Sequence, residues 1–260
     1  MKLSLVYYTY RPGAFDLLID SLSRQDYDDW ELIIVDDYPY RDVDLYFSKL
    51  TSMGIPLVWY GRQKEKCYSD TPFSICNVMN TGLLNAAGDV VVFLQDYSWL
   101  PRTALSRWNE VFNSIDGNSA VSGVGLEYHY NGRFANIGID FSMFDPRFDN
   151  GDFGRFTPYH KWEPEYFELF YSAFPMSMLK RINGFDERSD YTCDGCYNIF
   201  VEQAKLWGFK LGVDHKNIVS IINHRAWKFT HPSLWEVKLR ADDINKLFTP
   251  EKISPNCFRL

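Results

Sequence analysis

A chain of 260 residues is long enough to bury a sizeable core as one large α/β domain, with or without a subdomain. The net charge of −7 and the lack of any lysine or arginine cluster argue against an extended nucleic-acid footprint, although one small phosphate-bearing ligand is compatible with them. Because no apolar run reaches about 18 residues, we expect no membrane-spanning helix.

The start of the chain and its cysteines bear on location. Met1 and Lys2 lead directly into a strand-like run, without the apolar region and cleavage site of a signal peptide. The five cysteines are an odd number and spread out, so we expect reduced thiols in a cytoplasmic protein.

Aromatic residues make up 17% of the chain and gather in its second half, which indicates either an aromatic core or a surface that stacks on sugars or bases.

The first hundred residues alternate short apolar runs with segments of helical periodicity. Unbroken apolar runs predict buried strands, and apolar residues three and four apart predict amphipathic helices. Their alternation predicts a mostly parallel sheet with helices on both faces. The expected strands are residues 3–8, 31–35, 55–60 and 90–94. The expected helices are residues 14–25, 42–53, 71–87 and 101–113, and the inward face of the second is expected to hold Val43, Tyr46, Phe47 and Leu50.

The second half departs from this alternation. Residues 131–162 are rich in Gly, Pro, Asp and aromatics, and a loop of that length without its own elements is usually functional. Strands are expected at residues 120–130, 210–213 and 218–222, and helices at residues 174–182, 194–207 and 235–247.

Polar side chains stand where several expected strands end. Thr9 and Tyr10 follow the first strand, Asp36 and Asp37 the second, and Asp96 the fourth. The carboxyl ends of parallel strands meet at one crevice, where ligands bind in open α/β sheets. One such acid alone is equally compatible with a helix cap or turn, but clustered carboxylates repel one another unless a cation or hydrogen-bond donors hold them. Hard oxygen ligands suit Mg²⁺ or Mn²⁺ bound to a phosphate.

A series of landmarks runs along the chain from residue 3 to about residue 225. They are residues 6–12, residues 31–37, Asn80-Thr81-Gly82-Leu83 with Ala87-Gly88-Asp89, Phe93-Leu94-Gln95-Asp96 with Pro101, Gly184-Phe185-Asp186-Glu187, Asp194 and His224. In this order they resemble glycosyltransferase family 2. The resemblance implies a GT-A fold with a Rossmann-like nucleotide half (1–115), an acceptor and catalytic half of the same domain (116–230) and a C-terminal helix and tail (231–260).

The same resemblance implies where the donor nucleotide and a divalent metal, Mn²⁺ or Mg²⁺, bind. Asp37 can accept a hydrogen bond from uracil or thymine N–H, and Tyr10 can stack on the base. Asp96 matches the last acid of the D-x-D motif of the family and is expected to bind the metal, whereas Gln95 stands where the family usually has another acid. The expected donor-binding residues are Thr9, Tyr10, Arg11, Asp37, Gln95 and Asp96.

An inverting transfer needs a general base that deprotonates the acceptor hydroxyl. By the resemblance this base is Asp194, with Asp190 as a competitor and helix capping as the structural alternative.

By the same resemblance His224 completes the metal site or touches the diphosphate, unless it is a hydrogen-bonded structural histidine. Cys193 and Cys196 form a C-x-x-C without a second pair, which we interpret as coincidence. The expected acceptor or sugar pocket consists of Trp162, Glu163, Ser172, Asp186 and Glu187.

The sequence therefore predicts an inverting, metal-assisted glycosyltransferase with a UDP- or dTDP-sugar donor and a glycan or other sugar-bearing acceptor. Two alternatives stay open. The first is transfer to a modified nucleic-acid base, against which the missing basic face argues. The second is a GT-A module that binds a nucleotide sugar without catalysis, which Gln95 suggests.

Overall fold

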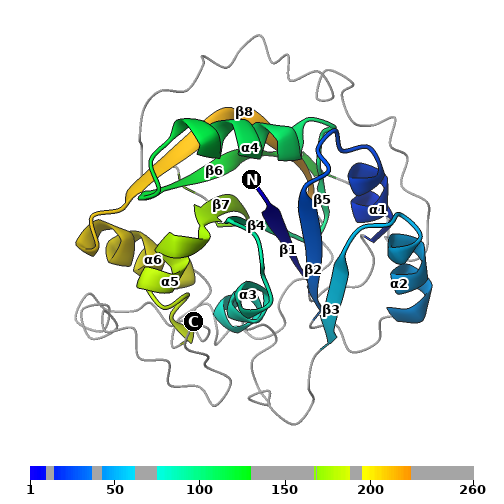
Figure 1. Ribbon diagram of the computed structural model, residues 1–260, viewed down its shortest axis with the longest axis horizontal. Helices are drawn as coiled ribbons and strands as arrows, with labels where there is room; N and C mark the ends of the chain where they lie inside the picture. Colours follow the sequence, from blue (N-terminus) through cyan, green and yellow to red (C-terminus); the bar gives the residue numbers. More distant parts are fainter. Residues whose placement is uncertain are drawn as a thin grey trace.

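A sheet of eight strands forms the centre of the described structure, with helices on both faces (Figure 1). The structure is a computed structural model, and it describes residues 1–9, 15–36, 43–61, 75–129, 167, 169–187 and 195–223. The strands are β1 (Leu3–Thr9), β2 (Trp30–Asp36), β3 (Leu57–Gly61), β4 (Val90–Gln95), β5 (Ser98–Trp99), β6 (Ser119–His129), β7 (Tyr171–Pro175) and β8 (Lys210–Asn223). The helices are α1 (Phe15–Ser23), α2 (Val43–Thr51), α3 (Ile75–Leu84), α4 (Ala104–Ser114), α5 (Met176–Arg181) and α6 (Gly195–Leu206).

The strands lie in the order β3-β2-β1-β4-β7-β6-β8-β5 across the sheet. β1 pairs in parallel with β2 and β4, and β2 pairs in parallel with β3. β7 is antiparallel to both of its neighbours, β6 and β8 are parallel, and β5 is antiparallel to β8. The predicted α/β class, with a mostly parallel sheet, is confirmed.

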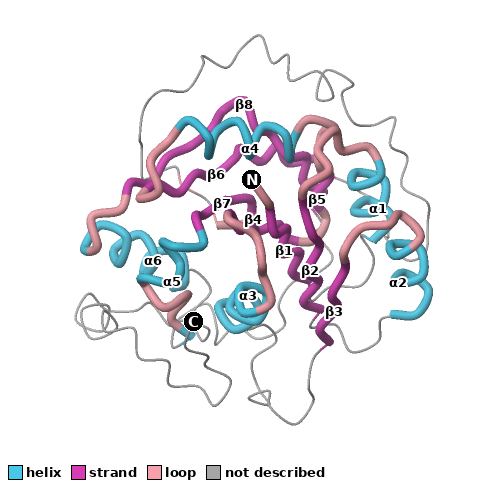
Figure 2. The backbone as a smooth tube through the Cα atoms, in the orientation of Figure 1, coloured by secondary structure: helices cyan, strands magenta, loops and turns pink. Residues whose placement is uncertain are grey.

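The helices divide between the two faces of the sheet, as the alternating residues of β1 show. Leu3, Leu5 and Tyr7 pack in one cluster with residues of α1, α2 and α4, whereas Val6 and Tyr8 pack in the other with residues of α3, α5 and α6. Figure 2 shows the strands between these two groups of helices. Because both faces are covered, all seven residues of β1 are buried, including the polar Ser4 and Thr9.

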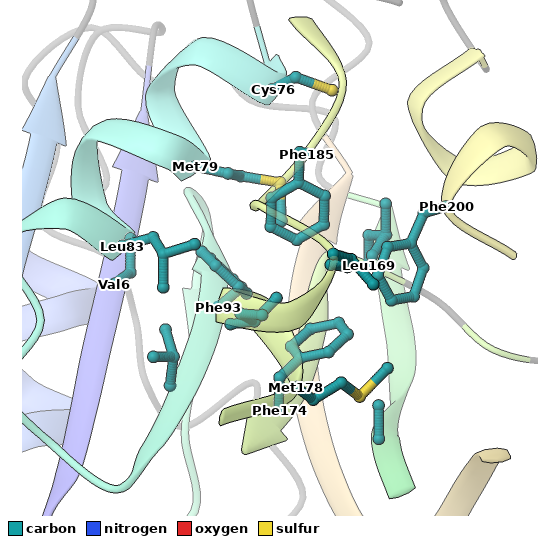
Figure 3. Packing of buried hydrophobic residues seen from close by; sticks show 14 of the residues in the cluster. Val6, Cys76, Met79, Leu83, Phe93, Leu169, Phe174, Met178, Phe185 and Phe200 are labelled. Atoms are coloured by element: carbon teal, nitrogen blue, oxygen red, sulfur yellow. The ribbon is translucent and has the colours of Figure 1, made fainter. Parts of the chain in front are cut away.

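Phenylalanine rings fill the core on the α3 side of the sheet (Figure 3). Phe93 and Phe174 meet edge to face, with ring centroids 5.7 Å apart. Phe185 lies 5.3 Å from Phe93 and Phe200 lies 5.2 Å from Phe174, again edge to face. Such arrangements add to the stabilisation that burial provides. These aromatic residues therefore belong to the core, which was one of the two interpretations of the composition.

Two predicted elements differ from the structure. The predicted helix at residues 174–182 begins only at Met176, because the apolar residues before it form β7 between β4 and β6. The predicted strands at 210–213 and 218–222 are one strand, β8, because its polar middle also has partners. Arg107 binds the carboxylate of Asp214 at 2.6 Å, and the Tyr171 hydroxyl donates to Asn217 Oδ1 at 2.7 Å.

Helix α2 buries less of its predicted inward face than expected. Leu50 is buried, but Val43 and Phe47 are 37% and 39% exposed. The reason is that α2 lies at the edge of the sheet. Among the described elements, its close contacts are with α1 and with the edge strand β3.

A polar cluster closes the amino ends of β1 and β2. Glu31 accepts hydrogen bonds from Lys2 Nζ at 2.7 Å, from Ser4 Oγ at 2.6 Å and from the Ala87 amide at 2.7 Å. Burial opposes ionisation of Glu31, but these hydrogen bonds outweigh it and lower the pKa of its carboxyl. The Gly88 amide donates to Ser4 Oγ at 2.8 Å, so this end of the sheet is filled by structural contacts.

The sheet curls strongly, as the connection between β4 and β5 shows. Only Asp96 and Tyr97 join these strands, although β7, β6 and β8 lie between them in the strand order. Four strand spacings of about 4.8 Å amount to about 19 Å, more than the ~11 Å that three residue steps can span. The sheet must therefore bend back on itself. An irregular pairing between Ser122 and Val124 marks a bend in β6.

Some predicted elements lie outside the described residues, namely the helix at 235–247 and the loop at 131–162. In the ranges that are described, no helix is both long and apolar enough to cross a membrane.

Candidate active site at the carboxyl ends of β1, β2 and β4

Three polar side chains gather where β1, β2 and β4 end. Thr9 is paired in register with Asp36 on β2, and its hydroxyl donates to Asp96 Oδ2, just beyond β4, at 2.9 Å. Asp36 and Asp96 are 3% and 2% exposed. The three ends converge because β1 lies between its two parallel partners. Thr9 therefore connects two buried acids from strands that are not adjacent in sequence.

The turn that carries Asp96 has an unusual backbone. Tyr97 adopts a φ of 60°, in the left-handed region that side chains other than glycine rarely occupy, and it is almost fully buried. This conformation turns the chain sharply from β4 into β5. Strain of this kind persists only where the surroundings enforce it, and it is typical of functional sites.

Trp99 anchors the far end of this turn against α1. Its indole Nε1 donates to Asp20 Oδ2 at 2.8 Å, and the Arg24 guanidinium lies 4.5 Å from the centroid of its ring. Arg24 also pairs with Asp20 at 3.1 Å. Asp96 is thus held from β1 through Thr9 and from α1 through Trp99. The sequence pattern did not identify β5 or this anchor.

Gln95 lies immediately before the turn and is half-buried. Its backbone amide donates to the carbonyl of Phe170 at 2.9 Å, which places it next to the start of β7. Ser172 on β7, a predicted pocket residue, is fully buried, and its hydroxyl donates to the Leu169 carbonyl at 3.0 Å. The structure therefore buries Ser172 inside the sheet, between β4 and β6, without exposed surface.

The predicted pocket residues Asp186 and Glu187 are also buried, with 5% and 4% exposure. Glu187 accepts hydrogen bonds from Asn80 Nδ2 at 2.9 Å and Asn77 Nδ2 at 3.2 Å, both on α3. Glu187 therefore connects α3 to the segment that follows α5.

Asn80 and Gly82 are structurally important residues to which sequence reasoning gave no role, although both lie in one of the landmarks. Gly82 lets α3 pack closely on β1, because a Cβ there would lie 2.2 Å from Val6 Cγ1. The available signal was a polar residue and a glycine on the side of the helix that is otherwise apolar and buried.

The other predicted site residues lie outside the described part of the chain. They are Tyr10, Arg11, Asp37, Trp162, Glu163, Asp194 and His224.

Asp96 is the described residue best suited to bind a divalent cation at this site. Its carboxylate supplies the hard oxygen that Mg²⁺ and Mn²⁺ prefer, and the Thr9 hydroxyl fixes one of its oxygens. Within the described ranges, no three His, Cys, Asp or Glu residues come together as a possible metal site. The donor chemistry of Asp96 fits such an ion as one ligand of a larger set.

Comparisons with known proteins give similarity at the level of the fold. No family model and no curated protein matches the sequence. The structure is similar to residues 1–349 of TarS from S. aureus, with a TM-score of 0.60, 18% identity, and coverage of 85% of this chain and 60% of that one. It is similar to the mannosyltransferase PcManGT from Pyrobaculum calidifontis, solved with GDP-Man and Mn²⁺ (TM-score 0.56, 18% identity, 87% and 58% coverage). It is also similar to GalNAc-T7, solved with UDP, GalNAc and Mn²⁺ (TM-score 0.62, 11% identity, 86% and 44% coverage).

This chain spans about half the length of each of those three chains, from 44% to 60%. At such low identity the similarity defines the fold, and membership of family 2 stays a prediction. The strand order, the helices on both faces and the similarity to these three structures together identify the fold of this chain as the GT-A glycosyltransferase fold.

Proposed function

We propose that this protein is an inverting glycosyltransferase that moves a sugar from a UDP or dTDP donor to a hydroxyl of a glycan or another sugar-bearing acceptor. The observation that carries the proposal is the Thr9–Asp96 hydrogen bond at the carboxyl ends of β1 and β4. It holds a buried carboxylate at the edge of the sheet where α/β folds bind nucleotides. Structures of similar fold contain UDP, UDP-GlcNAc or GDP-Man, which supports a nucleotide-sugar donor.

In this proposal the residues at the strand ends bind the donor. Thr9, Tyr10, Arg11 and Asp37 bind the nucleotide, and Gln95 donates from its side-chain amide to a hydroxyl of the ribose or the sugar. Asp96, with His224, would hold Mn²⁺ or Mg²⁺, which when bound offsets the negative charge of the leaving diphosphate. The Mn²⁺ in the PcManGT and GalNAc-T7 structures supports a divalent ion.

The proposed base is Asp194, which directly precedes the first residue of α6. Its carboxylate takes the proton of the acceptor hydroxyl while the oxygen attacks the anomeric carbon. The new glycosidic bond forms on one face of that carbon as the bond to the diphosphate breaks on the other, so the configuration inverts. Trp162 and Glu163 are proposed to contact the acceptor.

The first experiment is a thermal-shift screen of UDP-, dTDP- and GDP-sugars with and without Mn²⁺. We expect stabilisation by a UDP- or dTDP-sugar that depends on the metal, because binding to the native state raises the melting temperature. Asp96→Asn should abolish the metal-dependent part. The matched control is Asp116→Asn, because Asp116 is an exposed acid whose carboxylate is paired with Lys210.

Activity then separates catalysis from binding. Asp194→Asn should keep donor binding. It should lose the activity that is measured, which is either transfer to acceptor hydroxyls or hydrolysis of the donor. Full activity in this variant would overturn the assignment of the base. Donor binding without turnover in the wild-type protein, across a panel of sugar acceptors, would instead favour the non-catalytic alternative that Gln95 suggests.

A further inference from the structure

The amide side chain of Asn80 and the carboxylate of Glu187 form a buried contact between the two halves of the fold. Asn80 lies on α3, which packs on β1, and is 1% exposed. Glu187 follows α5 and β7, which belong to the other half, and is 4% exposed. The two residues are separated by 107 positions in sequence, yet Asn80 Nδ2 donates to Glu187 Oε1 at 2.9 Å.

Asn80 also replaces a backbone partner for Phe185. Its Oδ1 accepts from the Phe185 amide at 2.8 Å, and its Nδ2 donates to the Phe185 carbonyl at 2.9 Å. One side chain thus makes the pair of hydrogen bonds that a neighbouring strand would make. Asn77 adds a bond to Glu187 Oε2 at 3.2 Å, so each carboxylate oxygen accepts an amide from α3.

This contact fixes one end of a segment that matters for the proposed reaction. Residues 188–194, which end at Asp194, begin directly after Glu187 and lead into α6. The α6 end is held by packing, since Phe200 lies 5.5 Å from Phe185. Buried carboxylates are costly unless hydrogen bonds compensate them, and a glutamine or an apolar residue would avoid that cost. The hydrogen bonds from Asn80 and Asn77 offset part of that cost, and they fix the position of Glu187 against α3.

We infer that Asn80 and Glu187 are positioning residues, which align α3 and the nucleotide-binding strand β1 with the chain that leads to the catalytic base. This inference rests on the proposed function, because it takes Asp194 as the base. Both residues are almost fully buried, so we expect them to affect the rate of transfer, through the position of the base, more than the binding of donor.

The polarity of the hydrogen bond gives a sharp test. In Asn80→Asp an oxygen replaces the Nδ2 donor, so two carboxylates face each other. In Glu187→Gln one end of the new amide carries N–H groups, so one of the two asparagine donors on α3 must face another donor. In the double variant the introduced glutamine can donate to the introduced aspartate and accept from Asn77, which restores the contact between positions 80 and 187 in reversed direction. The hydrogen bond from position 80 to the Phe185 carbonyl stays lost, because an aspartate has no donor for it.

We expect each single variant to lower kcat about tenfold or more, with the KM for the donor little changed, and the double variant to regain part of the loss that Asn80→Asp causes. Asn113→Asp is the matched control, because Asn113 is exposed on α4, on the opposite face of the sheet. A double variant no better than the worse single variant would overturn the inference. Single variants that lose thermal stability but keep kcat would also overturn it, because the contact would then be structural only.

Hydrogen–deuterium exchange provides a readout that does not depend on activity. The peptide covering residues 183–187 should exchange faster in both single variants, because each one disturbs the side chain at position 80 to which the Phe185 amide donates. Exchange in the double variant should be slower than in Asn80→Asp. Equal exchange in all four proteins would overturn the contact itself. If the wild-type protein shows no transfer while the exchange pattern holds, the proposed function fails and the alignment of the two halves stands.

Discussion

The hydroxyl of Thr9 donates to the carboxylate of Asp96 at 2.9 Å, across the two parallel strands that end at the site. Thr9→Val removes this donor with little change of shape. Removing a group that hydrogen-bonds a metal ligand typically costs about 10–100-fold in metal affinity or activity, so we expect kcat/KM to fall by about tenfold or more. Thr9→Ser keeps the hydroxyl and should keep most of the activity. Steady-state kinetics with saturating Mn²⁺ distinguish the two, and equal losses in both variants would contradict this role of the hydroxyl.

The left-handed conformation of Tyr97 predicts an unusual order of stability for two substitutions. Alanine at a φ of 60° is strained by about 1–2 kcal/mol, whereas glycine is not. Tyr97→Gly should therefore be at least as stable as Tyr97→Ala in urea unfolding, although both lose the buried ring.

The control for Tyr97 is Ser48, which is exposed on α2. In a helix, alanine is favoured over glycine by about 1 kcal/mol, so Ser48→Ala should be more stable than Ser48→Gly. The same order at Tyr97 as at Ser48 would show that the turn after Asp96 carries no backbone strain.

Close packing of α3 on β1 predicts that Gly82→Ala is destabilising. The added methyl would lie 2.2 Å from Val6 Cγ1, and both residues are buried, so the helix must shift. Overpacking of this kind costs about 1–3 kcal/mol. The double variant Gly82→Ala with Val6→Ala should lose less than the sum of the two single losses. Gly117→Ala is the control, because nothing lies within 4 Å of a Cβ at that position.

The cluster around Glu31 predicts a dependence of stability on pH. The pKa of Glu31 is lower in the folded protein than its ordinary value of 4.5, so the unfolded chain takes up its proton first as the pH falls. Its contribution is therefore present above the unfolded pKa and lost as the pH falls through the lower folded pKa. Urea unfolding between about pH 5 and about pH 3 should show a smaller loss of stability in Glu31→Gln than in the wild-type protein. An identical pH profile in the two proteins would contradict this.

The alternation of buried strands and amphipathic helices was predictable because the apolar runs of β1, β2 and β4 are buried on both faces. The unbroken run in β4 and the acid after it led directly to Asp96. β7 was not predictable in the same way, because an apolar run that continues into a helix has no boundary visible in the sequence. Phe174 is a core residue of either element, so periodicity could not separate them.

The candidate site was predictable where it depends on one strand, and less so where it depends on distant pairs. Asp96 follows from its own strand, whereas its anchor Trp99 depends on a contact with Asp20 that is 79 residues away. The resemblance placed Glu187 near the proposed base, as either a structural or an acceptor-facing residue. Its partners on α3 are asparagines, whose role depends on a contact across the fold that no local pattern reveals.

The short connection from β4 to β5 gives the curl of the sheet a mechanical meaning. A curled sheet without such a connection could flatten by moving its strands apart. Here the two residues Asp96 and Tyr97 join β4 and β5, although β7, β6 and β8 lie between them in the sheet. Any opening of the curl would have to pull on Asp96. The position of the Asp96 carboxylate therefore depends on the curvature of the sheet. A ligand that holds this carboxylate rigidly should make the pairing of β5 with β8 harder to open.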